Sequence, residues 1–200
     1  AKVRLELRYE LKRIQRESGI TAVYVTHDQE EALSISDRVV VMEEGEVRQI
    51  GTPEEIYAHP ACRFVAQFIG ISNLLDVRLE SREKGIVKWK NTTMYASVLP
   101  KDIEKDSECL MVVRPESIEI ISADDWEENR ALPFGGREEG AVIEGTVLDR
   151  VFLGSSFRYA VSVHGHTVYV DHHEVGQVRF SHGDKVNLRI GRSAAEVIRQ

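Results

Sequence analysis

The residue best placed for chemistry is His27, which follows the apolar run Ile20–Thr26 (ITAVYVT) and precedes a predicted helix. That run is apolar on both faces and rich in β-branched residues, which is typical of a buried strand in a parallel α/β sheet. Ligands of open α/β sheets bind where strands end, and helix N-termini attract phosphate groups. An imidazole at this place could donate a hydrogen bond to a terminal phosphate oxygen. The alternative is a structural histidine whose ring is hydrogen-bonded within the protein at the end of the strand.

Histidines and charged residues elsewhere are weaker candidates for chemistry. Two histidines in the pattern His-x-His on one strand can bind a metal ion together. In His164-Gly165-His166, however, Gly165 predicts a hairpin turn and not a strand. The spacing of these histidines matches no compact zinc signature, so we expect no metal site. Arg114-Pro115-Glu116 is interpreted as a structural turn, and the acidic run Asp124–Glu128 as a solvated loop. The histidines concerned are His164, His166, His172, His173 and His182.

The sequence lacks the signatures of self-sufficient catalysis. It contains no G-x-x-x-x-G-K-[ST] segment to hold the phosphates of a nucleotide, and no Lys-Ser or Lys-Thr follows Gly135-Gly136. No local pattern indicates a Ser-His-Asp or Cys-His nucleophile. No apolar run ends in a pair of carboxylates suited to magnesium. We therefore expect that this chain alone does not hydrolyse a nucleotide.

Composition narrows the class of protein. The chain has 200 residues, of which 42% are hydrophobic and 30% charged, which is ordinary for a globular protein of one or two domains. Its formal net charge of −7 argues against nucleic acid as a partner. Two cysteines, Cys62 and Cys109, cannot build a disulfide framework, and no apolar run is long enough to cross a bilayer. A cytosolic, reducing location fits best.

The first stretch, residues 1–70, is predicted to mix helices and strands. Apolar residues recur at helical spacing over Val3–Ile14, and Gly19 supplies the left-handed residue that ends this helix. Asp28 and Glu31 form an acidic variant of the capping box at the start of a short helix. Further expected elements are strands at 38–42 and 47–50 around a turn with Gly45, a helix that begins at Thr52-Pro53-Glu54-Glu55, and a helix at 61–68.

The second stretch, residues 71–200, is predicted to be a small β-barrel or sandwich, because short strand-like runs alternate with turn residues. The segment Asp124–Gly140 is expected to form a loop. Exposed aromatic residues in a basic groove could grip single-stranded nucleic acid, but residues 140–200 hold seven basic and six acidic residues, which argues against it. The strand-like runs are 74–79, 85–89, 109–113, 143–152, 157–163, 167–171 and 185–190, and the aromatic residues are Phe152, Phe157, Tyr159 and Tyr169.

The segment VYVTHDQEEALSISDRVVVMEEGEVRQIGTPEEIYAHPACRFVAQFIG closely resembles the ATP-binding subunits of ABC importers, in the branch that serves sugars, polyamines, ferric iron and similar solutes. Residues 1–70 resemble the end of the nucleotide-binding domain. Residues 71–200 resemble its C-terminal TOBE domain, an OB-like barrel, through MVVRPESIEI (111–120), Phe152-Leu153-Gly154 and Gly183-Asp184-Lys185-Val186. The expected fold is therefore an α/β remnant of a P-loop nucleotide-binding domain followed by an all-β OB-like barrel.

The resemblance implies a role for His27 as the switch-loop histidine, which contacts the γ-phosphate of ATP and helps to position the attacking water. In the family, the Walker A lysine, the signature motif and the Walker B residues precede the position that corresponds to Ala1, which would follow the D-loop directly. This chain would then be the C-terminal part of an ATPase that uses ATP and Mg, with no cofactor expected in this part alone. The implied partners are a second copy of the chain and the transmembrane permease subunits, at the cytoplasmic face of the cell membrane.

Two functions stay open at this stage. The first is the truncated ATPase subunit described above, and the second is a non-catalytic regulatory or dimerisation module whose barrel binds a small ligand or another protein. In either case the predicted strand Ile20–Thr26 lacks its neighbours, and an exposed apolar edge tends to find a partner. We therefore expect residues 1–70 either to pack on a second copy or to be partly disordered.

Overall fold

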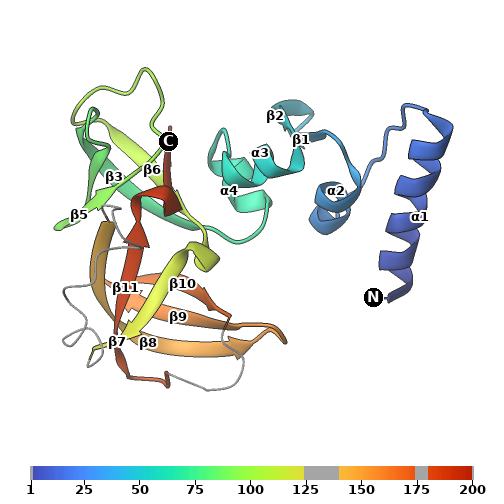
Figure 1. Ribbon diagram of the computed structural model, residues 1–200. Coiled ribbons are helices and arrows are strands. Elements are labelled where there is room, and N and C mark those ends of the chain that lie inside the picture. Colours follow the sequence, from blue (N-terminus) through green and yellow to red (C-terminus); the bar gives the residue numbers. More distant parts are fainter. Residues whose placement is uncertain (1, 124–139, 174–179, 200) are drawn as a thin grey trace. The chain divides into compact units, whose positions relative to one another are not determined.

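The computed structural model describes residues 2–123, 140–173 and 180–199 of the chain. The chain divides into two compact units, Ala1–Gly70 and Ile71–Gln200, whose elements are labelled in Figure 1. None of the described helices is long and apolar enough to cross a membrane.

The first unit combines four helices with one hairpin. Its small core contains Val39 and Val41 of the hairpin, Ile56, Val65 and Ile69, all buried. The elements are α1 (Lys2–Ser18), α2 (Gln29–Ile35), β1 (Val39–Glu43), β2 (Glu46–Gly51), α3 (Pro53–Ala58) and α4 (Arg63–Phe68).

Local signals in the first unit act as the sequence predicts. Gly19 has a φ of +64° and ends α1, because a residue without Cβ adopts the left-handed conformation without strain. The side chain of Thr52 accepts a hydrogen bond from the Glu55 amide, and the Glu55 carboxylate accepts one from the Thr52 amide, which forms a complete capping box. Gly45, with a φ of +84°, lies in the tight turn between the antiparallel strands β1 and β2.

The prediction of a buried strand at Ile20–Thr26 is wrong for this structure. These residues form no strand, and Val23 and Val25 are 90% and 89% exposed. A strand covered on both faces needs neighbours for its N–H and C=O groups, and the sheet of the described first unit is the β1–β2 hairpin alone. The expected α/β remnant with a parallel sheet is therefore not observed, because the neighbouring strands of such a sheet are absent from the described residues.

The second unit is built of strands, as the sequence predicts, and each named strand pair in it is antiparallel. One sheet has the order β10-β9-β8-β11-β7 and the other β12-β6-β3-β4-β5. The strands are β3 (Asn73–Ser81), β4 (Ile86–Trp89), β5 (Thr92–Tyr95), β6 (Glu108–Val113), β7 (Ile118–Ser122), β8 (Gly140–Phe152), β9 (Phe157–Val163), β10 (His166–His172), β11 (Lys185–Gly191) and β12 (Ala195–Ile198), with short 3-10 turns at Pro115–Ser117 and Arg192–Ala194.

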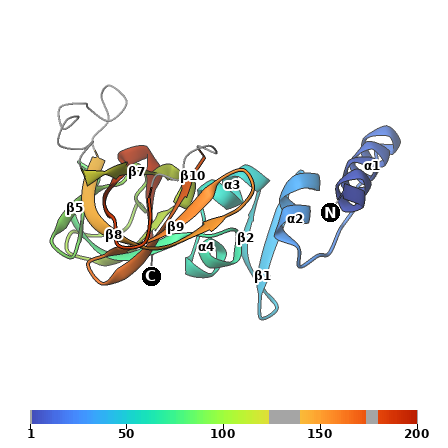
Figure 2. The ribbon, with the colours of Figure 1, turned by 90° about the horizontal axis from the view of Figure 1, so that it is seen from below.

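The two sheets of the second unit enclose one hydrophobic core, and in Figure 2 their strands curve around a common interior. Trp89, Tyr159 and Leu188 are among the largest buried side chains. Gly145 on β8 allows a close approach, since a Cβ at this position would lie 2.5 Å from Cγ1 of Val161 on β9. The second unit therefore has a complete core of its own.

Asn73 links the two sheets of the second unit. Its Nδ2 donates to the Tyr169 carbonyl over 2.8 Å, and its Oδ1 accepts from the Tyr169 amide over 2.7 Å. The side chain is buried, with 4% of its surface exposed. A side-chain amide thus takes the place of a neighbouring strand beside β10.

We expect Asn73→Ala to destabilise the second unit by about 2 kcal/mol, because two hydrogen bonds are lost and a backbone donor and acceptor lose their partners. The measurement is the free energy of unfolding in urea. Asn91→Ala is the matched control, since Asn91 is exposed and its replacement should cost less than about 0.5 kcal/mol. Equal stability of the two variants would contradict the bridging role of Asn73.

Candidate functional site

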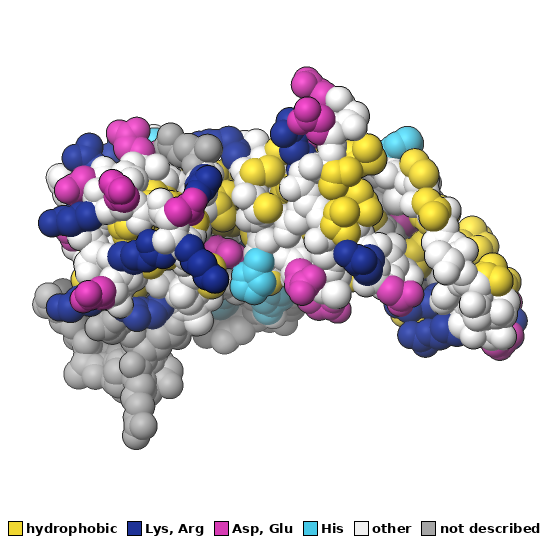
Figure 3. Space-filling model, turned by 90° about the horizontal axis from the view of Figure 1, so that it is seen from above, with side chains coloured by type: hydrophobic (Ala, Val, Ile, Leu, Met, Phe, Trp, Pro, Cys, Tyr) yellow, Lys and Arg dark blue, Asp and Glu magenta, His cyan; other side chains and the backbone are white. Residues whose placement is uncertain are grey.

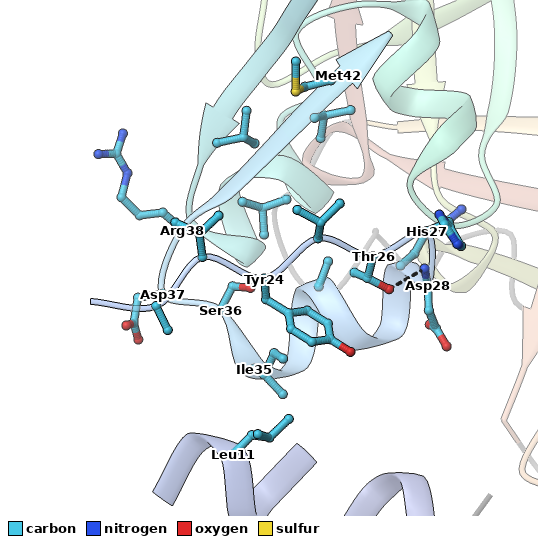
Figure 4. A pocket seen from close by; sticks show the side chains of 18 of the residues that line it. Leu11, Tyr24, Thr26, His27, Asp28, Ile35, Ser36, Asp37, Arg38 and Met42 are labelled. Carbon is cyan, nitrogen blue, oxygen red and sulfur yellow. Dashed lines mark hydrogen bonds between the residues drawn. The ribbon is translucent and has the colours of Figure 1, made fainter. Parts of the chain in front are cut away.

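His27 lies at the junction between the extended segment 20–26 and α2. Its side chain is exposed, and no hydrogen bond of the ring is found among the described residues. It lines a hollow of about 820 Å³ formed by segment 20–26, α1, α2, β1 and the end of α4 (Figure 4). The structure therefore places an available imidazole at the rim of an open depression.

The backbone on both sides of His27 is fixed by hydrogen bonds. The Asp28 amide donates to Thr26 Oγ1 over 2.9 Å, and the same hydroxyl donates to Glu31 Oε2 over 2.9 Å. Asp28 Oδ1 accepts from the Glu31 amide over 3.2 Å and caps α2, but the Asp28 amide donates to Thr26 and not to Glu31, so only half of the predicted capping box forms. The residues before and after His27 are thus anchored, while the imidazole between them is left available.

Acidic groups dominate the surroundings of His27. Asp28, Glu30 and Glu31 lie within one turn, and Arg8 on α1 contacts all three carboxylates. The charge of the Glu31 carboxylate raises the pKa of the Tyr24 hydroxyl, which donates to it over 3.3 Å. Sequence reasoning missed Arg8, because nothing in the local sequence links it to residues twenty positions away.

The wall of the hollow is apolar and exposed. Val23, Val25, Val40 and Met42 line it, and each has at least half of its surface open to solvent. Figure 3 shows hydrophobic side chains gathered on a face of the first unit. An uncovered apolar face of this kind is typical of an interface rather than of a finished surface.

The described residues around His27 do not form a nucleotide site by themselves. Helix α2 has seven residues, and its Glu31 amide already donates to Asp28, so it adds little to phosphate binding. The carboxylates do not fit a magnesium ion either, because Asp28 and Glu31 use their oxygens for Arg8, Thr26 and the cap. The arrangement can present one hydrogen-bonding imidazole to a ligand held by other groups.

The histidines of the second unit do not form a metal site in the described part of the chain. His164 occupies the β9–β10 turn with a φ of +50°, and its Nε2 lies 3.0 Å from Thr92 Oγ1. His182 Nδ1 lies 2.7 Å from the Leu148 carbonyl oxygen. Both rings therefore have structural partners in turns.

The remaining candidates that lie within the described residues have structural roles. Arg114 is buried and donates to Ser72 Oγ over 2.6 Å, directly before the 3-10 turn of Pro115, so this step acts as a turn. Tyr159 belongs to the core and cannot stack on a base, whereas Phe152 and Tyr169 are exposed. The acidic run Asp124–Glu128, the predicted loop around it and the pair Gly135-Gly136 lie outside the described residues.

Residues 111–198 match the family model of the TOBE domain. A spermidine/putrescine import ATP-binding protein PotA from Mesorhizobium japonicum is 35% identical over 203 residues, covering 99% of this chain and 51% of that protein. The homologue from Clostridium acetobutylicum is 38% identical over 94% of this chain and 47% of its own length. In the Onion yellows phytoplasma homologue, 49% identity extends over 60% of this chain and 28% of that protein.

These comparisons confirm the predicted resemblance to importer ATP-binding subunits and to the TOBE domain. The chain spans about half the length of the relatives that it matches along nearly its whole length. Among solved structures, the cytoplasmic molybdate-binding protein ModG aligns with a TM-score of 0.52 and 12% identity, over 64% of this chain and 96% of ModG. That likeness concerns the fold alone, and it supports an OB-like barrel.

Proposed function

We propose that this chain, which carries a TOBE domain and is similar along nearly its whole length to import ATP-binding proteins, is the C-terminal half of the ATP-binding subunit of an ABC importer. Residues 1–70 would then complete a P-loop nucleotide-binding domain, and residues 71–200 would be its TOBE regulatory domain. The single observation that carries the proposal is the exposed His27, anchored on both sides, beside an apolar face that lacks a cover.

The proposed role of His27 is to donate a hydrogen bond to the terminal phosphate of ATP. Catalysis of phosphoryl transfer depends mainly on positioning and on electrostatic stabilisation, and a fixed donor at the terminal phosphate supplies both. Magnesium would be bound by groups upstream of this chain, since the carboxylates beside His27 are already engaged. This chain's contribution is one imidazole, on a loop whose flanking residues are fixed by hydrogen bonds among Thr26, Asp28 and Glu31.

The uncovered face of the first unit supports the same proposal. Segment 20–26 has the composition of a buried strand and would pair with strands of the upstream half. The homologue from Mesorhizobium japonicum is long enough to contain such an upstream half, because this chain covers 51% of it. In the complete subunit, two copies would close around ATP and move the permease, at the cytoplasmic face of the membrane. The names of the relatives favour spermidine and putrescine as the solute class.

A second candidate function is a regulatory or dimerisation module that binds no nucleotide. The second unit favours this candidate for the chain taken alone, because its barrel has a complete hydrophobic core. A ligand or protein on the barrel could then bias the complete subunit between states.

We expect this chain alone to show no measurable affinity for ATP, since the phosphate-binding loop is absent from its sequence. The measurement is isothermal titration calorimetry with Mg-ATP, and the control is the complete subunit, for which we expect saturable binding. Micromolar binding by this chain that is lost in His27→Ala would contradict the proposal that the chain is half of the site.

The residues encoded upstream of Ala1 provide the most direct test of the proposed function. A phosphate loop, a signature motif and an aspartate-glutamate pair are expected there. A coding region that lacks all three would overturn the assignment as an ATPase subunit and would leave the regulatory module.

A further inference from the structure

Arg8 brings a largely buried cation to the carboxylates that surround His27. Its side chain is 14% exposed, and its Nη2 lies 3.3 Å from Asp28 Oδ2. The same atom lies 3.9 Å from Glu31 Oε1, and Nη1 lies 3.7 Å from Glu30 Oε2. Its Nε is buried without a hydrogen-bond partner, so the two terminal nitrogens make the polar contacts.

The carboxylates that Arg8 meets also anchor the His27 loop. Asp28 turns Oδ2 to Arg8 and uses Oδ1 to accept the Glu31 amide. Glu31 turns Oε1 to Arg8 and uses Oε2 to accept from Thr26. Each of these carboxylates has one oxygen for α1 and one for the loop, so a displacement of Arg8 changes both anchors.

The charge of Arg8 matters for any anionic ligand at His27. Three carboxylates within one helical turn would repel a phosphate, and the repulsion is strong where water is partly excluded. Glu30 is 87% exposed and is screened by solvent, whereas Asp28 and Glu31 are 35% and 20% exposed. The guanidinium offsets the charge of these two less exposed groups.

We infer that Arg8 is a positioning residue for the proposed ATP hydrolysis: it holds the His27 loop through Asp28 and Glu31 and offsets their charge where the terminal phosphate would bind. The inference rests on the proposed function, because only a nucleotide-binding subunit brings that phosphate to His27. A purely structural tie between α1 and α2 is the alternative, and the two make different kinetic predictions.

The first test uses this chain with the substitution Arg8→Gln. We expect the backbone amide signals of His27, Asp28 and Glu31 to move in NMR spectra, with hydrogen exchange roughly two- to fivefold faster. The matched control is Arg13→Gln, because Arg13 lies on the same helix and pairs with Glu10 and Glu17 instead. Unchanged signals in Arg8→Gln would overturn the inference.

The second test uses the complete subunit, in which this chain is joined to its upstream half. We expect Arg8→Gln to lower kcat for ATP hydrolysis roughly tenfold with KM changed less than twofold, because a misplaced group weakens transition-state contacts more than nucleotide binding. Arg8→Lys should restore part of kcat, since it keeps the charge but loses the two-nitrogen geometry. Arg13→Gln should leave both constants unchanged.

The outcomes separate this inference from the proposed function. If His27→Ala lowers kcat while Arg8→Gln does not, the inference fails and the proposed function stands. If His27→Ala leaves turnover unchanged, the proposed function fails, and the positioning role toward ATP fails with it. If Arg8→Gln changes KM alone, Arg8 contacts the nucleotide and is not a positioning residue. Should Arg8→Gln not fold, Arg8→Lys carries the same comparison against wild type.

Discussion

Replacing His27 with alanine in the complete ATP-binding subunit should lower the turnover of ATP by roughly 10²–10³-fold, the loss that follows removal of one fixed donor to a developing charge. The residues around His27 are anchored by their own hydrogen bonds, so the substitution removes the imidazole and leaves the loop in place. The affinity for ATP should change little, because the groups that hold most of the nucleotide lie upstream. Steady-state hydrolysis and nucleotide binding are measured on the same preparation.

The matched control for this experiment is His173→Ala, which removes an exposed histidine of the second unit. Its turnover should equal that of the wild type. A complete subunit in which His27→Ala hydrolyses ATP and drives transport at the normal rate would show that the imidazole has no role at a phosphate.

The second large effect concerns the mass of this chain in solution. We expect light scattering to report association above the 22.7 kDa of one chain, because apolar side chains of segment 20–26 and of β1 are exposed on the first unit. Introducing Val23→Lys together with Val25→Lys should return the chain to a monomer, since two charges on this face oppose its burial.

The matched control adds the same charge elsewhere on the first unit, with Ser34→Lys and Gln67→Lys, both at exposed polar positions. Association should persist in this control. If the wild-type chain is a monomer, hydrogen exchange over residues 20–26 should be as fast as in an unfolded peptide. A stable monomer with a protected segment 20–26 would contradict the expectation of an unmet interface.

Local signals and tertiary surroundings explain which parts of the fold could be predicted from the sequence. The helix start at Thr52, the Gly45 turn and the Gly19 helix end depend on neighbours within a few residues, and all three are observed. Strands β5, β7 and β12 were not predicted, although β4, which is as short as β5 and β12, was; runs of four or five residues give only a weak alternation signal.

Segment 20–26 shows the opposite case. Its apolar, β-branched residues are suited to a strand that is covered on both faces, and the described residues provide no such cover. The same limit applies to the candidate site. His27 could be recognised from its place after an apolar run, whereas the contact of Arg8 with Asp28 depends on how α1 packs against α2.

The two hydrogen bonds of the Asn73 side chain also protect the edge of the barrel from pairing with other molecules. Strand β10 lies at the edge of its sheet, where free backbone groups can recruit a strand from another molecule and begin a fibril. At the centre of that edge, both polar groups of the Tyr169 backbone are already occupied by one side chain. A strand from another molecule would have to displace the Asn73 side chain before it could pair with β10 at Tyr169. We therefore expect Asn73 to oppose aggregation through this edge.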